Sequence, residues 1–358
     1  MLSRTAVDLF AGAGGASQGL TDAGFNVLGA IENDPVAAAS LVANHGRVHA
    51  EVADIRTVDE RGFRERLGLK PGELSLLKAC PPCQGFSSLA SGEVDSARND
   101  LVLDVARFVR EFRPEAVLLE NVPGLARDAR LPALLDEIHG LGYRSRQYIV
   151  QAAEFGVPQR RRRLIVIAVR NTAIRELPGD LRGLLPKSYD VNATTAGEAL
   201  AQIPADALIG DRLNIARKPS PIVKRRIEAI PVGGNRFDLP DDLRLACHAK
   251  IEAKGRRNAT SPYGRIKADQ PAPTMTTRCT TPSCGSFIHP TEHRGITLRE
   301  AATLQTFPHA YQFLGTYEQI ERQIGNAVPV KLAHALGVAV RELVAAEGVE
   351  AVSVEAAA

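Results

Sequence analysis

Short apolar runs alternate with amphipathic stretches over the first 170 residues of the chain. Short apolar runs bounded by turn residues are typical of buried strands, and apolar residues every three to four positions are typical of helices. The pattern predicts strands at 5–10, 26–31, 48–53, 74–78, 116–119, 143–150 and 164–169, and helices at 16–23, from 35 onward with Asp34 as its cap, at 98–112 and at 131–141. Strands that alternate with helices favour an α/β fold with a doubly wound, mostly parallel sheet.

The regular alternation weakens from about residue 171. Prolines, glycines and short polar stretches replace it, which predicts a second, smaller and irregular domain. Helical patterns return at 294–304 and 331–344, and Thr297 and Glu300 have the spacing of a capping box.

One predicted strand ends in the turn Pro81-Pro82-Cys83-Gln84-Gly85. The prolines stop the strand and stiffen the turn, and the glycine lets a ligand approach the backbone. Ligands of α/β folds bind beyond the carboxyl ends of the strands, so Cys83 stands where a reactive thiol would meet a substrate. A cysteine in an isolated motif of this kind is more often structural and half-buried, so the role of Cys83 has to be inferred from the other motifs of the chain.

A glycine loop at 11–15 follows the first predicted strand and precedes a helix. Backbone N–H groups of such a loop suit a nucleotide, although glycine loops also serve tight turns. Glu32 ends the next strand, 20 positions after Gly12, where a carboxylate accepts hydrogen bonds from two ribose hydroxyls. Asp54 and Ile55 follow the third strand and would suit an adenine ring, whereas any one of these acids alone is more often a helix cap.

Composition and charge narrow the class of protein. The chain has 358 residues, 44% hydrophobic and 24% charged, which is ordinary for a globular protein of two domains. It has no apolar run of membrane-spanning length, no expected signal peptide and an odd number of cysteines, five, so we expect a cytoplasmic protein with reduced thiols. The net charge is +3, but residues 170–270 carry 18 Lys and Arg against 12 Asp and Glu, which indicates either a polyanionic partner or a solvated basic surface.

Six stretches, in order, make the chain resemble the cytosine-C5 DNA methyltransferases over nearly its whole length. They are 8–15, 81–87, 120–122, 159–163, 294–308 and 325–330. The resemblance implies the S-adenosylmethionine-dependent methyltransferase fold, S-adenosylmethionine as methyl donor and double-stranded DNA as substrate. It implies a catalytic domain at 1–172, completed by 318–358, and a target-recognition domain with a hinge at 173–317. We expect a monomer without a metal ion or a membrane partner.

The resemblance also implies the residues of the site. Around the donor it places Phe10, Gly12, Glu32, Asp54, Ile55, Pro82, Leu101, Asn326 and Val328. The catalytic residues that it implies are Cys83, Glu120, Arg161 and Arg163. Alternation along an extended strand would put Arg161 and Arg163 on one face, and Arg160 and Arg162 on the other.

The chemistry of cytosine methylation requires these residue types. A thiolate that adds to C6 of the ring makes C5 nucleophilic, and Cys83 is the candidate, assisted by the charge of Arg161 or Arg163. Negative charge then develops on the ring, so a protonated Glu120 would hydrogen-bond N3 and the exocyclic amine. A base stacked in duplex DNA is out of reach, so the cytosine must flip out.

Other functions fit less well. A cytosine-C5 methyltransferase acting on transfer RNA keeps the chemistry, but the recognition region is large for that substrate. A nicotinamide-dependent dehydrogenase would need Gly-x-Gly-x-x-Gly, and 12–17 lacks the third glycine. A catalytically inactive DNA-binding module would leave Cys83 and Glu120 without a purpose.

Further cysteines and histidines suggest a metal site only weakly. Cys279, Cys284, His289 and His293 are separated by short spacings, whereas zinc fingers place a longer loop between their ligand pairs. Cys80 precedes the two prolines, and we expect it to pack.

Overall fold

The computed structural model describes residues 4–82, 99–170, 174, 176–192, 194–205, 210–245 and 261–345 of the chain. The chain divides into two compact units, of which the first contains 1–151, 162–190 and 330–358. The second contains 152–161 and 191–329. The functional domains predicted at 1–172 with 318–358 and at 173–317 have other bounds, and they remain a prediction.

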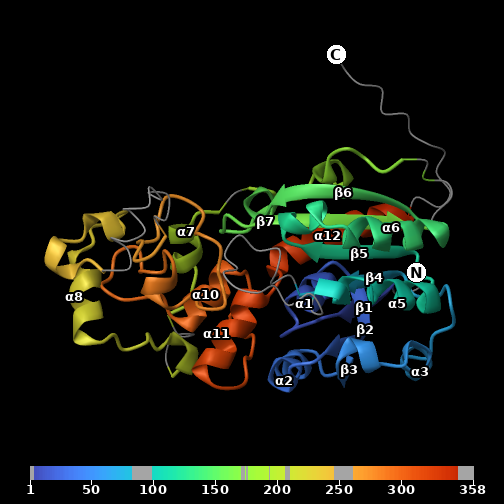
Figure 1. Cartoon of the computed structure of the whole chain (residues 1–358), viewed down its shortest axis with the longest axis horizontal. Coiled ribbons are helices and arrows are strands. Elements are labelled where there is room, and N and C mark those ends of the chain that lie inside the picture. Colours follow the sequence, from blue (N-terminus) through green and yellow to red (C-terminus); the bar gives the residue numbers. More distant parts are fainter. Residues whose placement is uncertain are drawn as a thin grey trace, which may run out of the picture. The chain divides into compact units, whose positions relative to one another are not determined.

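A seven-stranded sheet forms the centre of the first unit (Figure 1). Its strands are β1 (Arg4–Leu9), β2 (Phe25–Glu32), β3 (His49–Val52), β4 (Leu76–Ala79), β5 (Ala116–Asn121), β6 (Arg144–Gln151) and β7 (Arg162–Val169). Their order is β3-β2-β1-β4-β5-β7-β6. The pairs from β3 to β5 are parallel, and β7 is antiparallel to both of its neighbours. The predicted α/β class with a mostly parallel sheet is confirmed.

Helices of the first unit lie on both faces of the sheet. They are α1 (Gly15–Asp22), α2 (Pro35–Asn44), α3 (Glu60–Arg66), α5 (Val105–Phe112), α6 (Arg130–Gly140) and α12 (Val330–Ala345). Helices α1 and α12 pack closely, because a Cβ built on Gly19 would lie 2.4 Å from Val330 O and 2.6 Å from Ala333 Cβ. Helix α5 begins seven residues after the start of the predicted helix at 98, and a 3-10 turn, Asp100–Val102, precedes it.

Side-chain alternation places four charged residues of the central strands on the same face of the sheet. The core on the side of α3, α5 and α6 takes every second strand residue: Val7, Leu9, Leu77, Ala79, Val117, Leu119, Leu164 and Val166. Successive side chains of a strand point to opposite faces, so Asp8, Lys78, Glu120 and Arg163 share the other face. We call these four residues the charge row. They come from the neighbouring strands β1, β4, β5 and β7, and their charges alternate in sign.

A buried ion pair lies at one end of the charge row. Lys78 Nζ is 2.8 Å from Asp8 Oδ1, and the two side chains are 3% and 0% exposed. Ser17 Oγ donates a hydrogen bond to Asp8 Oδ2 at 2.7 Å, which ties α1 to β1. Burial is the largest single effect on Lys78 and would lower its pKa, but the charge and hydrogen bond of Asp8 together with the other negative groups nearby outweigh it, and the net pKa is raised. Lys78 is therefore held as a cation inside the sheet.

The second unit is built from short helices and 3-10 turns. Its helices are α7 (Ala196–Ala201), α8 (Pro221–Ala229), α10 (Leu298–Leu304) and α11 (Tyr317–Asn326). Thr297 caps α10 and forms the predicted capping box with Glu300, so the helix begins at Leu298 rather than at Arg294. In the described parts of both units, no helix combines the length and the apolar character needed to cross a membrane.

We predict that Lys78→Met lowers the free energy of unfolding by about 3–5 kcal/mol, because it leaves the Asp8 carboxylate buried without its counter-charge. The measurement is urea denaturation followed by circular dichroism. The double variant Asp8→Asn/Lys78→Met removes both charges and should recover part of the loss. A double variant no more stable than Lys78→Met would contradict the assignment of the pair.

Candidate active site

The loop after β1 has the backbone of a ligand cradle. Gly12 and Gly14 have φ angles of 57° and 88°, a conformation that favours glycine. A Cβ built on Gly12 would meet no atom within 4 Å, so the space above the loop is open among the described residues. Phe10 also has a positive φ, 57°, which strains the backbone at the end of β1. Such strain is typical of functional loops.

Glu32 is anchored beside this loop by two backbone donors. Its Oε2 accepts a hydrogen bond from the N–H of Gly12, and its Oε1 accepts one from the N–H of Asp34, both at 2.8 Å. Burial raises the pKa of Glu32 above its ordinary value, and the two N–H donors offset the rise in part. Asp34 caps α2 by accepting from the N–H groups of Val36 and Ala37, as the sequence predicts.

The other donor residues predicted in the first unit come after β3 and β4 in the chain. Asp54 caps a 3-10 turn and binds the Arg56 side chain, which lowers the pKa of Asp54. Ile55 is 3% exposed and belongs to the apolar core, and Leu101 is half-buried against that core. Pro82 is half-buried and is the last residue described before 99. The structure thus places these residues, and their contact with a methyl donor remains a prediction.

The loop after β4 is fixed at its base from two sides. The N–H of Cys80 donates to Leu9 O of β1 at 3.2 Å. Asn121 Nδ2, at the end of β5, donates to Pro81 O at 3.1 Å. Cys83 lies outside the described residues, so its role remains a prediction, but the backbone that leads to it is held between β1 and β5.

Glu120 is a buried carboxylate with one partner on each oxygen. The residue is 3% exposed, Arg163 Nε lies 2.7 Å from Oε1, and the Cys80 thiol donates to Oε2 at 2.8 Å. Among the described residues Oε1 has no hydrogen bond of good geometry, so the contact with Arg163 is a close but poorly aligned ion pair. The expectation that Cys80 only packs is wrong, because its thiol makes a polar contact with Glu120.

Burial alternates along 159–163 as predicted. Arg160 and Arg162 are exposed, Arg161 is 4% exposed, and the side chain of Arg163 is 12% exposed. Arg163 directly precedes Leu164, and Leu164 pairs with Asn121 of β5 in the antiparallel register. This register explains why Arg163 reaches Glu120.

Arg161 binds backbone carbonyl groups of the second unit. Its guanidinium donates to the carbonyls of Met275 at 3.0 Å and Gly325 at 3.4 Å. Gln159 joins two segments of this unit. Its Nε2 donates to Gln305 Oε1 at 2.8 Å, and its Oε1 accepts from the Met275 N–H at 2.9 Å. These contacts give Arg161 a structural role, and its catalytic role remains a prediction.

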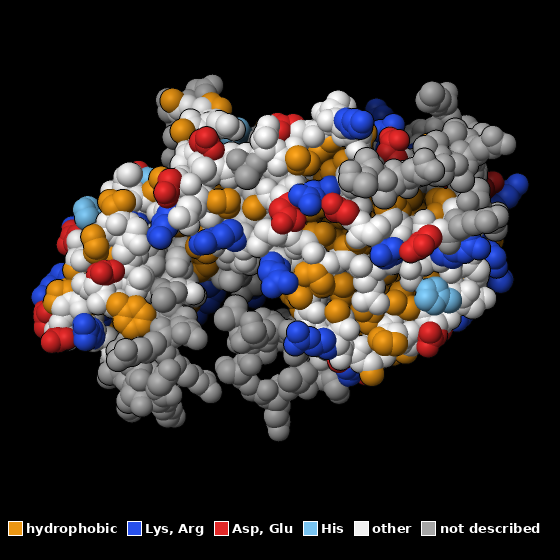
Figure 2. All heavy atoms as spheres, turned by 90° about the horizontal axis from the view of Figure 1, so that it is seen from above, with side chains coloured by type: hydrophobic (Ala, Val, Ile, Leu, Met, Phe, Trp, Pro, Cys, Tyr) orange, Lys and Arg blue, Asp and Glu red, His pale blue; other side chains and the backbone are white. Residues whose placement is uncertain are grey.

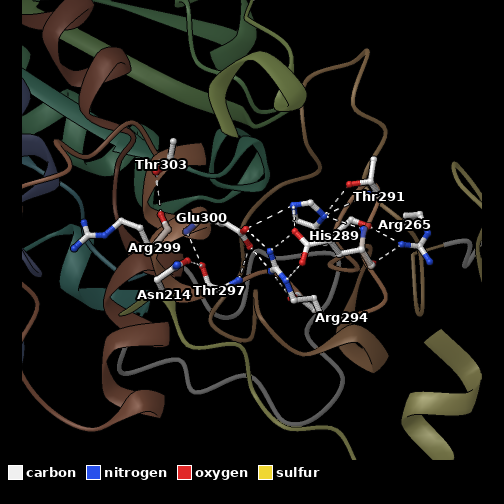
Figure 3. Close-up of polar contacts among 11 residues, drawn as sticks. Asn214, Arg265, His289, Thr291, Arg294, Thr297, Arg299, Glu300 and Thr303 are labelled. Carbon is white, nitrogen blue, oxygen red and sulfur yellow. Dashed lines mark hydrogen bonds and ion pairs between the residues drawn. The ribbon is translucent and has the colours of Figure 1, made fainter. Parts of the chain in front are cut away.

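A second polar network surrounds the start of α10 (Figure 3). Arg294 donates to both oxygens of Glu300, at 2.8 and 2.7 Å, and the N–H of Thr297 donates to Glu300 as well, at 2.8 Å. His289 Nε2 lies 3.6 Å from Glu300, and burial lowers the pKa of His289. Arg265 donates to the carbonyl of His289 at 2.8 Å. The stretch 294–304 therefore organises the interior of the second unit.

The residues considered as zinc ligands have other environments. Cys279 is buried, which raises the pKa of its thiol, whereas Cys284 is exposed. His289 Nδ1 accepts hydrogen bonds from the N–H groups of Thr291 and Glu292. In the part of the chain that the structure describes, no group of three or more His, Cys, Asp or Glu side chains could hold a metal ion.

Basic residues of the second unit include some with internal partners. Arg225 pairs with Asp242 at 3.2 Å, and Arg226 Nε donates to Leu243 O at 2.8 Å. Figure 2 shows acidic side chains interspersed among basic ones on one face of the chain. Contacts of this region with DNA remain a prediction, as do donor contacts of Asn326 and Val328, which also belong to the second unit.

Comparison with known proteins identifies the family. The sequence model of the C-5 cytosine-specific DNA methylases matches residues 4–342. The chain belongs to this family. It is 32% identical over 343 residues to the type II methylase M.HgiDII of Herpetosiphon aurantiacus, covering 94% of each chain. It is 34% identical to the type II methyltransferase M.PspPI of a Psychrobacter strain, covering 94% of this chain and 79% of that one.

Solved structures agree on the fold of this DNA cytosine methyltransferase. A methyltransferase encoded within an E. coli prophage matches with a TM-score of 0.68 at 24% identity, covering 95% of this chain and 99% of the other. The S. pombe Dnmt2 methyltransferase matches with a TM-score of 0.61 at 18% identity, covering 95% and 99%. At these identities the likeness concerns the fold.

Two residues near the site were missed in the sequence. Lys78 stands in a strand that is otherwise apolar, and Asp8 stands between Val7 and Leu9. A charged residue inside a buried strand is a usable signal, because such a residue needs a partner of opposite charge. The methyltransferase motifs indicate functions for the loops that follow these strands, and not for the two charged side chains within the strands.

We predict that Arg163→Met slows methyl transfer about tenfold to a hundredfold, because Glu120 loses the counter-charge that keeps its carboxyl group in place. Single-turnover transfer from labelled donor to duplex DNA measures the effect. Arg162→Met, at the exposed neighbouring position, is the matched control and should change the rate little. Equal rates for the two variants would show that the ion pair does not matter for the reaction.

Proposed function

We propose that the methyltransferase transfers the methyl group of S-adenosylmethionine to C5 of a flipped-out cytosine in a specific duplex DNA sequence, through a covalent bond between Cys83 and C6. The observation that supports the proposal most directly is Glu120, a buried carboxylate held at the end of β5 by Arg163 and Cys80. It stands beside the Pro-Pro-Cys turn, since Asn121 binds the carbonyl of Pro81.

The residues of the loop after β1 fit the donor. Open space above Gly12 admits a ligand close to the backbone, and the Glu32 carboxylate beside it can accept ribose hydroxyls with its remaining lone pairs. Asp54 and Ile55 follow β3 and would meet the adenine. When bound, S-adenosylmethionine supplies an electrophilic methyl group.

The protein's own residues prepare the cytosine. The Cys83 thiolate adds to C6, which raises the electron density at C5, the atom that receives the methyl group. Glu120, protonated in the closed site, donates to N3 and accepts from the exocyclic amine, so it stabilises the ring as charge develops. Arg163 keeps the carboxyl group in place. Removal of the C5 proton by a base then lets the thiolate leave.

The second unit supplies the target-recognition residues in this proposal. Its short helices and turns present side chains that would read base edges and hold phosphates. M.HgiDII and M.PspPI are type II methylases, which supports a role in a restriction-modification system. The family match does not favour transfer RNA as the substrate. In this proposal the protein acts as a monomer in the cytoplasm.

We predict that affinity for the methyl donor falls as the pH drops toward the pKa of Glu32. Because this pKa is raised, the fall should begin at a higher pH than a carboxyl group with the ordinary pKa of 4.5 would give. The ionised carboxylate accepts ribose hydroxyls, and protonation removes that capacity. A raised pKa means that the folded chain binds this proton more readily than the unfolded chain, so Glu32 itself does not unfold the protein there. Calorimetric titration with donor from pH 7 downward measures the effect, and Glu32→Gln should bind weakly without this pH dependence. The same pH dependence in Glu32→Gln would assign it to another group.

Trapping on fluorinated DNA tests the reaction. Attack at C6 and methyl transfer do not need the C5 hydrogen, but release does. Fluorine at C5 cannot leave as a cation, so enzyme and methylated base should stay joined. We expect an adduct on 5-fluorocytosine duplex DNA that requires S-adenosylmethionine, survives denaturing electrophoresis and is absent in Cys83→Ser.

Cys80→Ser is the matched control, because it changes the neighbouring thiol but keeps a hydrogen-bond donor, and it should still form the adduct. No adduct despite activity on unmodified duplex would overturn the C5 mechanism. A preference for fluorinated transfer RNA would keep the chemistry and overturn the substrate.

A further inference from the structure

Cys80 occupies a fixed place between the two loops of the site. It directly follows β4, and its backbone N–H is bound to Leu9 O, the last residue of β1. Its side chain lies on the same face of β4 as Lys78, two residues earlier, because side chains alternate along an extended chain. This is the face of the charge row, so the thiol meets Glu120 rather than the apolar core.

The thiol is a directional donor to Glu120. It donates to Oε2 at 2.8 Å, whereas Arg163 lies 2.7 Å from Oε1 without good hydrogen-bond alignment. An ion pair of poor alignment attracts the carboxylate but does not fix its rotation. A hydrogen bond on the second oxygen does fix it, and a carboxylate has about four lone-pair positions, so acceptor capacity remains for a substrate.

The surroundings of Cys80 favour this contact. Lys78 is held as a cation by Asp8, and the negative charge of Glu120 contributes to the attraction that keeps it charged. The strand register places Lys78 beside Leu118, and Glu120 follows two residues later on the same face. Cys80 and Arg163 therefore each contact one oxygen of the Glu120 carboxyl group, and the charge of Lys78 attracts the same carboxylate.

We propose that Cys80 is a positioning residue, which orients Glu120 for its contact with the target cytosine through the hydrogen bond from its thiol. The inference rests on the role proposed above for Glu120. It gives the thiol that precedes the two prolines a role separate from that of Cys83: Cys80 touches neither the base nor the methyl donor, and it acts through Glu120.

Substitutions of similar size separate orientation from packing. Cys80→Ser keeps a donor, and Cys80→Ala removes it. We expect the single-turnover rate of Cys80→Ala to fall about tenfold, roughly the effect of one hydrogen bond to a charged group, and Cys80→Ser to restore most of it. A packing role predicts the opposite order, because alanine suits an apolar site better than serine. Donor affinity and thermal stability should be unchanged in both variants.

A double-mutant cycle shows whether the effect passes through Glu120. If Cys80 acts only by orienting this carboxyl group, Cys80→Ala should add little to the slow rate of Glu120→Gln. Cys284→Ala, which removes an exposed thiol of the second unit, is the matched control and should match the wild-type rate.

The outcomes are distinct. A wild-type rate for Glu120→Gln would overturn the proposed function of Glu120. A slow Glu120→Gln with an unaffected Cys80→Ala, or with Cys80→Ser as slow as Cys80→Ala, would overturn only the role of Cys80. Additive effects in the double variant would show that Cys80 acts elsewhere.

Discussion

The buried ion pair between Lys78 and Asp8 is the interaction on which the site depends. It joins β1 to β4, the two strands that carry the glycine loop and the Pro-Pro-Cys turn. The chain order also reverses here, since β2 and β3 lie on one side of β1 while β4 and β5 lie on the other. Ligands of open α/β sheets bind at such a switch point, and the ion pair joins the side chains of the two strands beneath it.

Burial of the two charges costs free energy, which explains why each charge has polar or charged neighbours. Two charges removed from water are stable only if each finds strong partners. Asp8 accepts from Ser17 as well as from Lys78, so the charge of β1 also anchors the helix that follows the glycine loop. On the other side Glu120 and Arg163 continue the alternation of charge. The charge row thus links the helix of the donor loop to the predicted catalytic acid.

The second unit uses buried polar groups in a different way. Its described β pairings are isolated bridges, so side-chain contacts connect its segments instead. Arg265 donates to four backbone carbonyls besides that of His289, namely those of Ile227, Ile230, Pro231 and Glu292. An arginine with several carbonyl partners can organise irregular backbone without a sheet. This construction suits the target-recognition role that we propose for the second unit.

The sequence by itself determined the strands and most helices of the first unit, the loops that follow them and the family. Strand and helix periodicity, the glycine loop, the caps at Asp34 and Thr297, and the buried face of 159–163 depend on near neighbours along the chain, so local patterns revealed them. Tertiary structure decided the partners. β7 follows β6 in the chain but inserts between β5 and β6, which brings Arg163 to Glu120 while Arg161 binds within the second unit. Strand alternation shows which face a side chain takes, but strand order decides which charge it meets there.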